Sequence, residues 1–285
     1  MLNIIDTTIR IPNLKKPLTL LHITDLHLTR ADFRDNEYVN WLSVDRKNAF
    51  PYSEDIFEEL KQYITNNRPD YSILTGDIID FPSENNLETL YDFLNNICKN
   101  YLYTLGNHDW CYPNQSPTDE TQSRYFSRFL PITNGTPDFQ VIDAGGVLLI
   151  GIDNTRGQIT TSQLNKFKTV FKRNIPCILF LHIPLYINTL IENVLAIWGQ
   201  PLIIGTPKEA FSGELHPSLV PTNETIEFCH LVENKDTPIF AILCGHVHFS
   251  HEDLFSEGKV QYVTKLCSTL ENTNGTIRRI KIINL

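Results

Sequence analysis

The sequence lacks the features that mark several large classes of protein. It has no long run of Lys or Arg and its formal net charge is −9, so a broad basic face for duplex nucleic acid is not expected. The longest apolar run, residues 175–187, is interrupted by prolines and by His182, and it is too short to span a bilayer. The N-terminus has no basic stretch followed by an apolar one, so it does not resemble a signal peptide.

The six cysteines are scattered and form no C-x-x-C pair. Without a secretory signal, we interpret them as reduced and mostly buried thiols and expect a cytoplasmic protein. The chain is 41% hydrophobic over 285 residues, which is enough for one large core. We expect a single domain over residues 1–285. Within it, the long Pro-punctuated segment 186–236 is either a lid or an ordinary surface excursion.

A short apolar run ends in a residue of metal-ligand type five times along the chain. Continuous apolar runs rich in β-branched and aromatic residues are typical of strands buried on both faces. The runs occupy residues 18–24, 71–76, 101–106, 177–181 and 239–245, and they lead to Asp25, Asp77, Asn107, His182 and His246. Helical patterns lie between them, so we predict an α/β layered fold with a site at the carboxyl ends of the strands.

Three segments have helical periodicity. One begins near Ser53, which is a suitable N-cap, and the others are Leu87–Ile97 and Thr161–Phe171. Residues 29–52 have little periodicity, and we expect an irregular connection there. For its charged residues, including Arg46, exposure to solvent is the more common outcome, although Arg pairs well with phosphate.

Two pairs of polar residues have a spacing of two. His27 follows Asp25 in this way, and His248 follows His246. In an extended chain, side chains two residues apart point to the same side. Each pair therefore predicts two ligands directed at one point.

The strand ends together offer more ligands than one metal ion needs. The candidates are Asp25, His27, Asp77, Asn107, His182, His246 and His248. Two ions that share one carboxylate would use all seven and leave positions for water and substrate. Mixed nitrogen and oxygen ligands without thiolate suit Mn, Fe or Zn as paired ions. Two such ions about 3.5–4 Å apart polarise a phosphoryl oxygen and activate water for in-line attack. We therefore predict a dimetal hydrolase of phosphate esters.

These residues lie in five blocks of sequence, which are Asp25-Leu-His27, Gly76-Asp77-Ile-Ile-Asp80, Gly106-Asn107-His108-Asp109, His182 and Gly245-His246-Val-His248. In type and order, over residues 25–248, the blocks resemble those of the calcineurin-like metallophosphoesterase superfamily. The resemblance implies two mixed β-sheets packed as a sandwich and flanked by helices, in four layers of α/β/β/α type.

The resemblance also implies a role for each residue. The first metal would be bound by Asp25, His27, Asp77 and His248. The second would be bound by Asp77, Asn107, His182 and His246, with Asp77 as the bridge. His108 would contact the phosphate and protonate the leaving oxygen, and Asp109 would orient His108. Asp80 would support the ligands from behind. Weaker candidates are Trp110, for the pocket wall, and His251, for which a surface role is the simpler interpretation.

The substrate stays open at this stage. Asp80 is followed by Phe81 rather than by the nearby Arg of Ser/Thr protein phosphatases, and the third block ends in Asp109 rather than Glu. The match is closer to bacterial-type phosphodiesterases and small-molecule phosphatases, so we expect a small-molecule phosphate ester. The alternatives are a nuclease of the same superfamily, which the acidic balance disfavours, and a non-catalytic interaction scaffold, which the complete ligand set disfavours.

Overall fold

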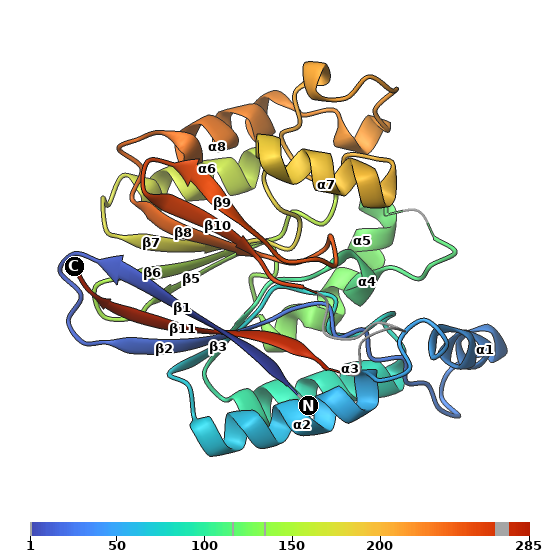
Figure 1. Ribbon diagram of the computed structural model, residues 1–285. Helices are drawn as coiled ribbons and strands as arrows, with labels where there is room; N and C mark the ends of the chain where they lie inside the picture. The colour runs from blue at the N-terminus through green and yellow to red at the C-terminus, as the bar shows by residue number, and fades with distance from the viewer. Residues whose placement is uncertain (1, 116, 134, 266–273) are drawn as a thin grey trace.

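The computed structural model describes residues 2–115, 117–133, 135–265 and 274–285, and its strands form two mixed sheets (Figure 1). The first sheet has the order β1 (Asn3–Ile11), β11 (Thr276–Asn284), β2 (Leu18–Ile23), β3 (Tyr71–Leu74) and β4 (Tyr101–Tyr103). The second has the order β5 (Phe139–Asp143), β6 (Leu148–Ile152), β7 (Cys177–Phe180), β8 (Ile239–Cys244), β10 (Lys259–Val263) and β9 (His251–Ser256). The strands that lead to the candidate ligands pair in parallel within each sheet.

Helices cover the outer face of each sheet (Figure 1). The first sheet is covered by α2 (Ser53–Asn67), α3 (Glu84–Asp92) and the π-helical segment η1 (Phe93–Cys98), and the second by α6 (Thr161–Phe171), α7 (Asn188–Trp198) and α8 (Asn223–Glu233). The shorter elements are α1 (Glu37–Arg46), α4 (Asn107–Trp110), α5 (Asp119–Phe126), η2 (Ser127–Ile132), η3 (Lys208–Ala210) and η4 (Pro217–Leu219). The predicted four-layer α/β/β/α sandwich is confirmed. Among the described residues, no helix combines the length and apolar character needed to cross a membrane.

The apolar strands divide their side chains between two cores. On β8, Ala241 and Leu243 face the other sheet, whereas Ile242 and Cys244 face the outer helices. This alternation follows from the period of two in a strand, and it explains why strands covered on both faces are apolar throughout. His22 on β2 is buried between the hydroxyls of Thr264 and Thr75, so it is a satisfied core residue.

The five predicted strands are all present, each ending two to four residues before its polar residue. The helix predicted over Leu87–Ile97 begins earlier, at Glu84, because the Ser83 hydroxyl caps it by accepting from the Asn86 amide. It then continues as η1. Residues 186–236, interpreted as either a lid or an ordinary surface excursion, contribute α7 and α8 to the outer layer of the second sheet.

The expectation of an irregular connection over residues 29–52 is wrong, because helix α1 forms there. Val39 and Leu42 are buried, but Trp41 and Val44 are exposed on the other side of the same helix. Apolar residues therefore lie on both faces, which removes the one-sided pattern that identifies a surface helix in sequence.

Five of the cysteines are free and buried, as expected of small apolar side chains in a core. The sixth, Cys267, lies outside the described residues.

Candidate metal centre

The loops after the strands of both sheets are joined by backbone hydrogen bonds. The Asp25 amide donates to the Gly76 carbonyl oxygen at 3.0 Å, which links the loops after β2 and β3 of the first sheet. The Gly245 amide donates to the His182 carbonyl oxygen at 3.0 Å, which links those after β7 and β8 of the second. The His246 amide then donates to the Asp25 carboxylate at 3.0 Å and connects the two sheets. The site is therefore built across the seam of the sandwich.

Five ligand candidates have a left-handed backbone conformation. Their φ angles are 53° at Asp25, 52° at His27, 52° at Asp77, 70° at His246 and 63° at His248. Residues other than glycine adopt this region rarely and at a cost, and such strain concentrates at functional sites. The expectation that the residues of each spaced pair share an extended strand is therefore wrong. Each pair still turns toward one site, but it does so through a strained loop.

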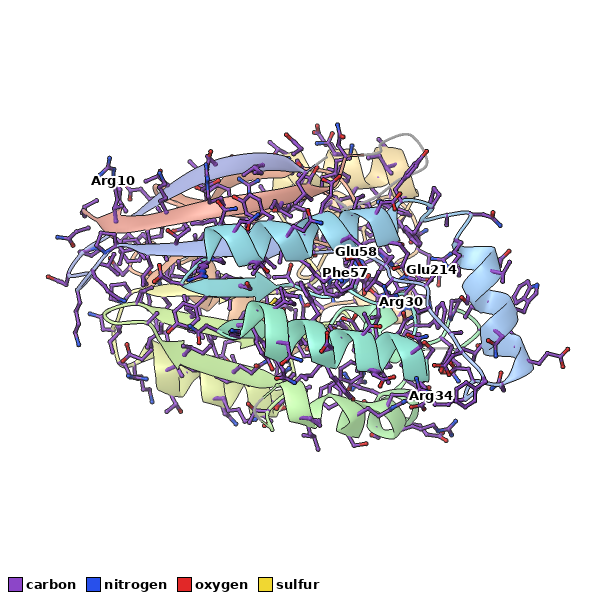
Figure 2. The ribbon with its side chains drawn as sticks, turned by 90° about the horizontal axis from the view of Figure 1, so that it is seen from below. Arg10, Arg30, Arg34, Phe57, Glu58 and Glu214 are labelled. Carbon is purple, nitrogen blue, oxygen red and sulfur yellow. The ribbon has the colours of Figure 1, made fainter. Side chains whose placement is uncertain are left out.

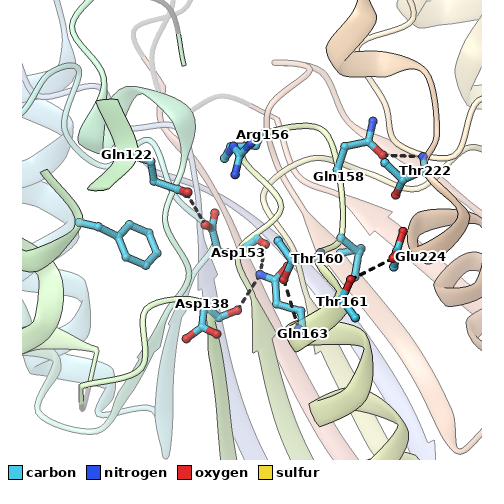
Figure 3. Close-up of a pocket in the computed structure, with 12 residues that line it drawn as sticks. Gln122, Asp138, Asp153, Arg156, Gln158, Thr160, Thr161, Gln163, Thr222 and Glu224 are labelled. Carbon is cyan, nitrogen blue, oxygen red and sulfur yellow. Dashed lines mark hydrogen bonds between the residues drawn. The ribbon is translucent and has the colours of Figure 1, made fainter. Parts of the chain in front are cut away.

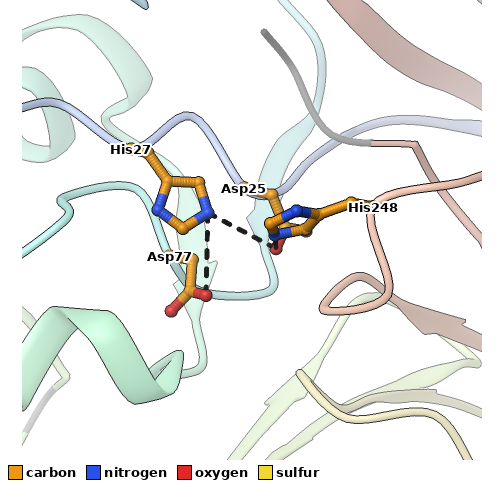
Figure 4. Close-up of side chains that lie close together, drawn as sticks. All are labelled: Asp25, His27, Asp77 and His248. Atoms are coloured by element: carbon orange, nitrogen blue, oxygen red, sulfur yellow. Dashed lines mark ion pairs between the residues drawn. The ribbon is translucent and has the colours of Figure 1, made fainter. Parts of the chain in front are cut away.

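The first cluster joins Asp25, His27, Asp77 and His248 (Figure 4). Nε2 of His27 lies 3.9 Å from Oδ1 of Asp25 and 3.8 Å from Oδ2 of Asp77. Nε2 of His248 lies 3.5 Å from the same Asp25 oxygen. Ligand atoms around one transition metal, each about 2.0–2.2 Å from it, lie about 3 to 4 Å from their neighbours. The spacing fits a single ion.

The second cluster joins Asp77, His182 and His246, with Asn107 beside it. Nε2 of His182 lies 3.2 Å from Oδ2 of Asp77, 3.2 Å from Oδ1 of Asn107 and 3.1 Å from Nδ1 of His246. The other ring nitrogen of His182 lies 2.7 Å from the Thr75 carbonyl oxygen, so Nε2 is the ligand atom. Asp77 belongs to both clusters, which is the position of a bridging ligand.

One buried atom tests directly whether these residues fit a metal. Nε2 of His27 is buried and has no hydrogen-bond partner among the described residues. An orphaned buried nitrogen is costly unless something else binds it. Its neighbours at 3.8 and 3.9 Å are carboxylate oxygens, too far for hydrogen bonds but suitably placed to share an ion with it. The donor set and this atom therefore fit a transition metal at the first cluster.

Electrostatics favours ionised carboxylates at the centre. Burial raises the pKa of Asp25, but the imidazoles of His248 and His182 outweigh it and lower that pKa to about 2. The same balance of burial against neighbouring histidines holds the pKa of Asp77 well below its usual range. Buried ionised carboxylates need compensating positive charge, which metal ions supply.

His108 lies beside the two clusters at the start of α4, and its side chain is 27% exposed. Its amide donates to Oδ1 of Asp77 at 2.9 Å, and its Nδ1 lies 3.3 Å from Oδ1 of Asp80. Burial lowers the pKa of the imidazole, but the carboxylates of Asp77 and Asp80 outweigh this and raise it to about 9.

Asp109 was expected to orient His108, but its carboxylate binds backbone amides instead. Its carboxylate accepts hydrogen bonds from the amides of Gly106, Asp77, Ile78 and Ile79, at 2.6 to 3.2 Å. It therefore ties the third block of sequence to the second. Asp80, rather than Asp109, lies against His108.

Three residues that sequence reasoning did not place at the site lie against its ligand candidates or against Asp80. The ring of Phe50 stacks on His27, with centroids 4.2 Å apart and planes 1° from parallel. Arg46 donates to both oxygens of Asp80, at 2.6 and 3.0 Å. The ring of Trp198, at the end of α7, meets His248 edge-on at 5.5 Å. Phe50 and Arg46 come from residues 29–52 and Trp198 from 186–236, so the two long connections supply these contacts.

The hydrogen bonds of the two weaker candidates go to residues other than the seven ligand candidates. Trp110 is fully buried, and its indole donates to the Thr155 hydroxyl at 2.9 Å. His251 begins β9, and its Nε2 lies 3.1 Å from the Thr189 hydroxyl. Behind Trp110, Thr155 donates in turn to Asp153 at 2.7 Å.

A cavity of about 360 Å³ opens beside Asp153 (Figure 3). It is lined mainly by polar side chains near the starts of α6 and α8 and contains none of the seven ligand candidates. Gln122 donates to the Asp153 carboxylate at 2.8 Å. The hydrogen bonds that join Asp153, Thr155 and Trp110 connect the cavity to α4.

A four-layer sandwich with two joined Asp/His clusters at its strand ends defines a metallophosphoesterase. The chain belongs to the calcineurin-like phosphoesterase family, whose model matches residues 18–250. This membership places it among metal-dependent hydrolases of phosphate esters.

The comparison with solved structures supports the fold. A dimetal phosphatase from Danio rerio is 13% identical, with 87% of each chain covered and a TM-score of 0.53. A putative 5'-nucleotidase from Staphylococcus aureus is 16% identical, covering 88% of this chain and 49% of that one, with a TM-score of 0.47. The chain thus spans about half the length of the second protein. No curated protein sequence matches it.

Proposed function

We propose that this chain hydrolyses a small-molecule phosphate ester, either a monoester or a diester, with two transition metal ions drawn from Mn, Fe and Zn. One observation carries the proposal: two clusters of ligand atoms share Asp77, and His108 lies beside them in a further group with Asp80 and His27. When bound, the two ions supply Lewis acidity toward the phosphoryl group and activate a water at neutral pH.

The residues of the chain divide the remaining work. Asp25, His27 and His248 hold the first ion with Asp77, while Asn107, His182 and His246 hold the second with it. His108, whose pKa the carboxylates of Asp77 and Asp80 raise, donates its proton to the leaving oxygen. Asp109 keeps the loops in register through four backbone amides.

The partly exposed residues support one side of the centre as the place where substrate enters. Asn107, His108, His246 and His248 are half-buried, whereas Asp25, His27, Asp77 and His182 are fully buried. Substrate therefore meets the side of the centre that carries His108. Trp198, which is 39% exposed and packs on His248, forms an apolar wall there. An apolar wall beside a polar centre supports a small-molecule ester.

The test is a panel of phosphate monoesters and diesters, including DNA ends, assayed with Mn²⁺, Fe²⁺ and Zn²⁺ beside a His108→Ala variant. We expect metal-stimulated hydrolysis of small esters that is lost on chelation and strongly reduced by His108→Ala. Cleavage confined to DNA ends would favour the nuclease. Metal analysis of the purified protein distinguishes the enzyme from the non-catalytic scaffold, because a scaffold would hold no transition metal after Mn supplementation.

A reducing, cytoplasmic location is part of the proposal. The five described cysteines are buried free thiols, which is usual for proteins of reducing compartments. Thiol titration of the unfolded protein without reductant, expected to find all the thiols free, tests this point.

A further inference from the structure

The contacts of Arg46 and Phe50 converge on one ligand candidate, His27. We propose that both are positioning residues of the metal centre: Arg46 acts through Asp80, and Phe50 through ring stacking, to hold Nε2 of His27 toward the first metal. The inference rests on the proposed function only in taking that nitrogen as a ligand. It assigns a role to helix α1 and the turn after it, which lie outside the five sequence blocks.

The first step is the contact between Arg46 and Asp80. Asp80 is fully buried, and Arg46 binds it at two points, Nε to Oδ2 at 2.6 Å and Nη2 to Oδ1 at 3.0 Å. A two-point guanidinium contact fixes the plane of a carboxylate as well as its position. The Asp80 oxygen is then held 2.9 Å from Nδ1 of His27. An imidazole can offer Nε2 to a metal only when Nδ1 carries the ring proton, and this contact keeps it there.

The second step is the stacking of Phe50. Its ring lies parallel to His27 at 4.2 Å and is itself 7% exposed. A flat neighbour at this distance restricts rotation of the imidazole about its last side-chain bond and keeps water from that face. The Arg46 guanidinium lies over Phe50, 5.0 Å from the ring centre. One residue therefore supports both partners of His27, the carboxylate and the ring.

The third step is how α1 is itself held in place. Val39 and Leu42 pack on Phe81, which directly follows Asp80 in sequence. The Ser43 hydroxyl donates to the Thr29 carbonyl oxygen. These few contacts make a small core, and the outward face of the helix is exposed at Trp41. The buried face of α1 thus packs on Phe81, the residue that follows Asp80.

The chain offers a matched control. Arg34 lies in the same connection (Figure 2). It pairs with Asp32 and with Glu88 of α3. Arg34→Ala removes the same side chain and two ion pairs without touching His27 or Asp80. Arg46→Lys keeps the charge but cannot make the two-point contact. Phe50→Leu keeps an apolar side chain but removes the flat ring.

The experiment measures Mn²⁺ affinity of the full chain by competition with a chelator. Loss of an outer partner of a metal-bound histidine lowers metal affinity about 10–100-fold, and we expect this for Arg46→Ala. A smaller loss is expected for Arg46→Lys and for Phe50→Leu, and no change for Arg34→Ala. Added guanidinium ion should restore part of the affinity of Arg46→Ala, because it can occupy the vacated place beside Asp80. Thermal unfolding of each variant checks that the protein is folded.

A second readout needs no metal. Ring-nitrogen NMR of the metal-free protein should find His27 with its proton on Nδ1 in the wild type and Arg34→Ala, and a mixture of tautomers in Arg46→Ala. The inference is overturned if Arg46→Ala has the same Mn²⁺ affinity and the same His27 tautomer as Arg34→Ala. It is also overturned if the loss of Mn²⁺ affinity in Arg46→Ala is explained by its unfolded fraction alone and added guanidinium ion restores no affinity. A wild type that neither binds metal nor hydrolyses esters would instead overturn the proposed function, while the tautomer measurement would still decide the inference.

Discussion

Nδ1 of His27 lies 2.9 Å from Oδ1 of Asp80, and this contact determines which nitrogen of the ring faces the metal centre. The same Asp80 oxygen also lies 3.3 Å from Nδ1 of His108. Attraction from both imidazoles and from Arg46 outweighs the effect of burial and lowers the pKa of Asp80. One ionised side chain therefore serves a metal ligand and the proposed proton donor together.

Asp80→Asn tests this double role. The amide keeps the size of the side chain but loses the charge, so we expect weaker metal binding, by about 10–100-fold, together with a lower pKa of His108. The measurement is Mn²⁺ competition with a chelator, followed by the pH dependence of hydrolysis. Asp253→Asn, on the edge strand β9, is the control and should leave both properties unchanged. Equal effects in the two variants would contradict the role of Asp80.

The proton-donor role of His108 predicts a dependence on the leaving group. Acid catalysis by a positioned side chain contributes about 10²–10⁴-fold to rate, and it matters most when the leaving oxygen is basic. His108→Ala should therefore reduce hydrolysis of alkyl phosphate esters far more than that of nitrophenyl esters, with metal content unchanged. His251→Ala provides the control, since its ring contacts Thr189 and not the clusters. A loss of equal size for both kinds of ester would show that His108 does not protonate the leaving group.

Gly76 and Gly258 both have a positive φ, but only Gly76 is closely packed against another loop. Comparing alanine substitutions at the two positions therefore measures the cost of that close packing. Gly76 has φ of +88° and Gly258 has φ of +67°. A Cβ at Gly76 would lie 2.2 Å from the backbone nitrogen of Gly106, whereas one at Gly258 would meet nothing within 4 Å. Gly258→Ala should cost about 1–2 kcal/mol for the left-handed conformation alone. Gly76→Ala should cost roughly 1–3 kcal/mol more, because backbone atoms cannot move aside as a side chain can. Urea unfolding of both variants gives the difference, and similar values would exclude a steric constraint at Gly76.

The sequence predicts the strands and the convergence of the ligand candidates well, for a physical reason. Each of β2, β3, β4, β7 and β8 is covered on both faces, so each is a continuous apolar run that ends where its polar residue begins. Both the run and its end are local properties of the chain, and parallel pairing then brings the ends to one edge.

What the sequence cannot predict depends on contacts between distant segments. Arg46 and Asp80 are 34 residues apart, and α1 has apolar residues on both faces, so no local pattern indicates either their contact or the helix. The left-handed conformation of Asp25 is supported by a hydrogen bond from its amide to Gly76, in another loop. The contact of Asp109 with four amides likewise depends on how two loops meet. The spacing of the polar residues therefore predicts which ligand candidates converge, but it does not predict the backbone conformation that presents them.

Asp153, outside the metal centre, predicts a dependence of stability on pH. Burial raises the pKa of its carboxyl to about 6, although hydrogen bonds from Thr155 and Gln122 oppose the shift. The folded state therefore binds a proton more tightly than the unfolded state does, so this contribution to stability is complete below about pH 4 and is lost as pH rises through about 6. The loss amounts to roughly 2–3 kcal/mol if the full shift is realised. Asp153→Asn removes the titrating group, so the difference in unfolding free energy between wild type and variant, measured in urea from pH 4 to 7, should move against the wild type as pH rises. A constant difference across that range would mean that the carboxyl titrates normally and that its burial is offset by its hydrogen bonds.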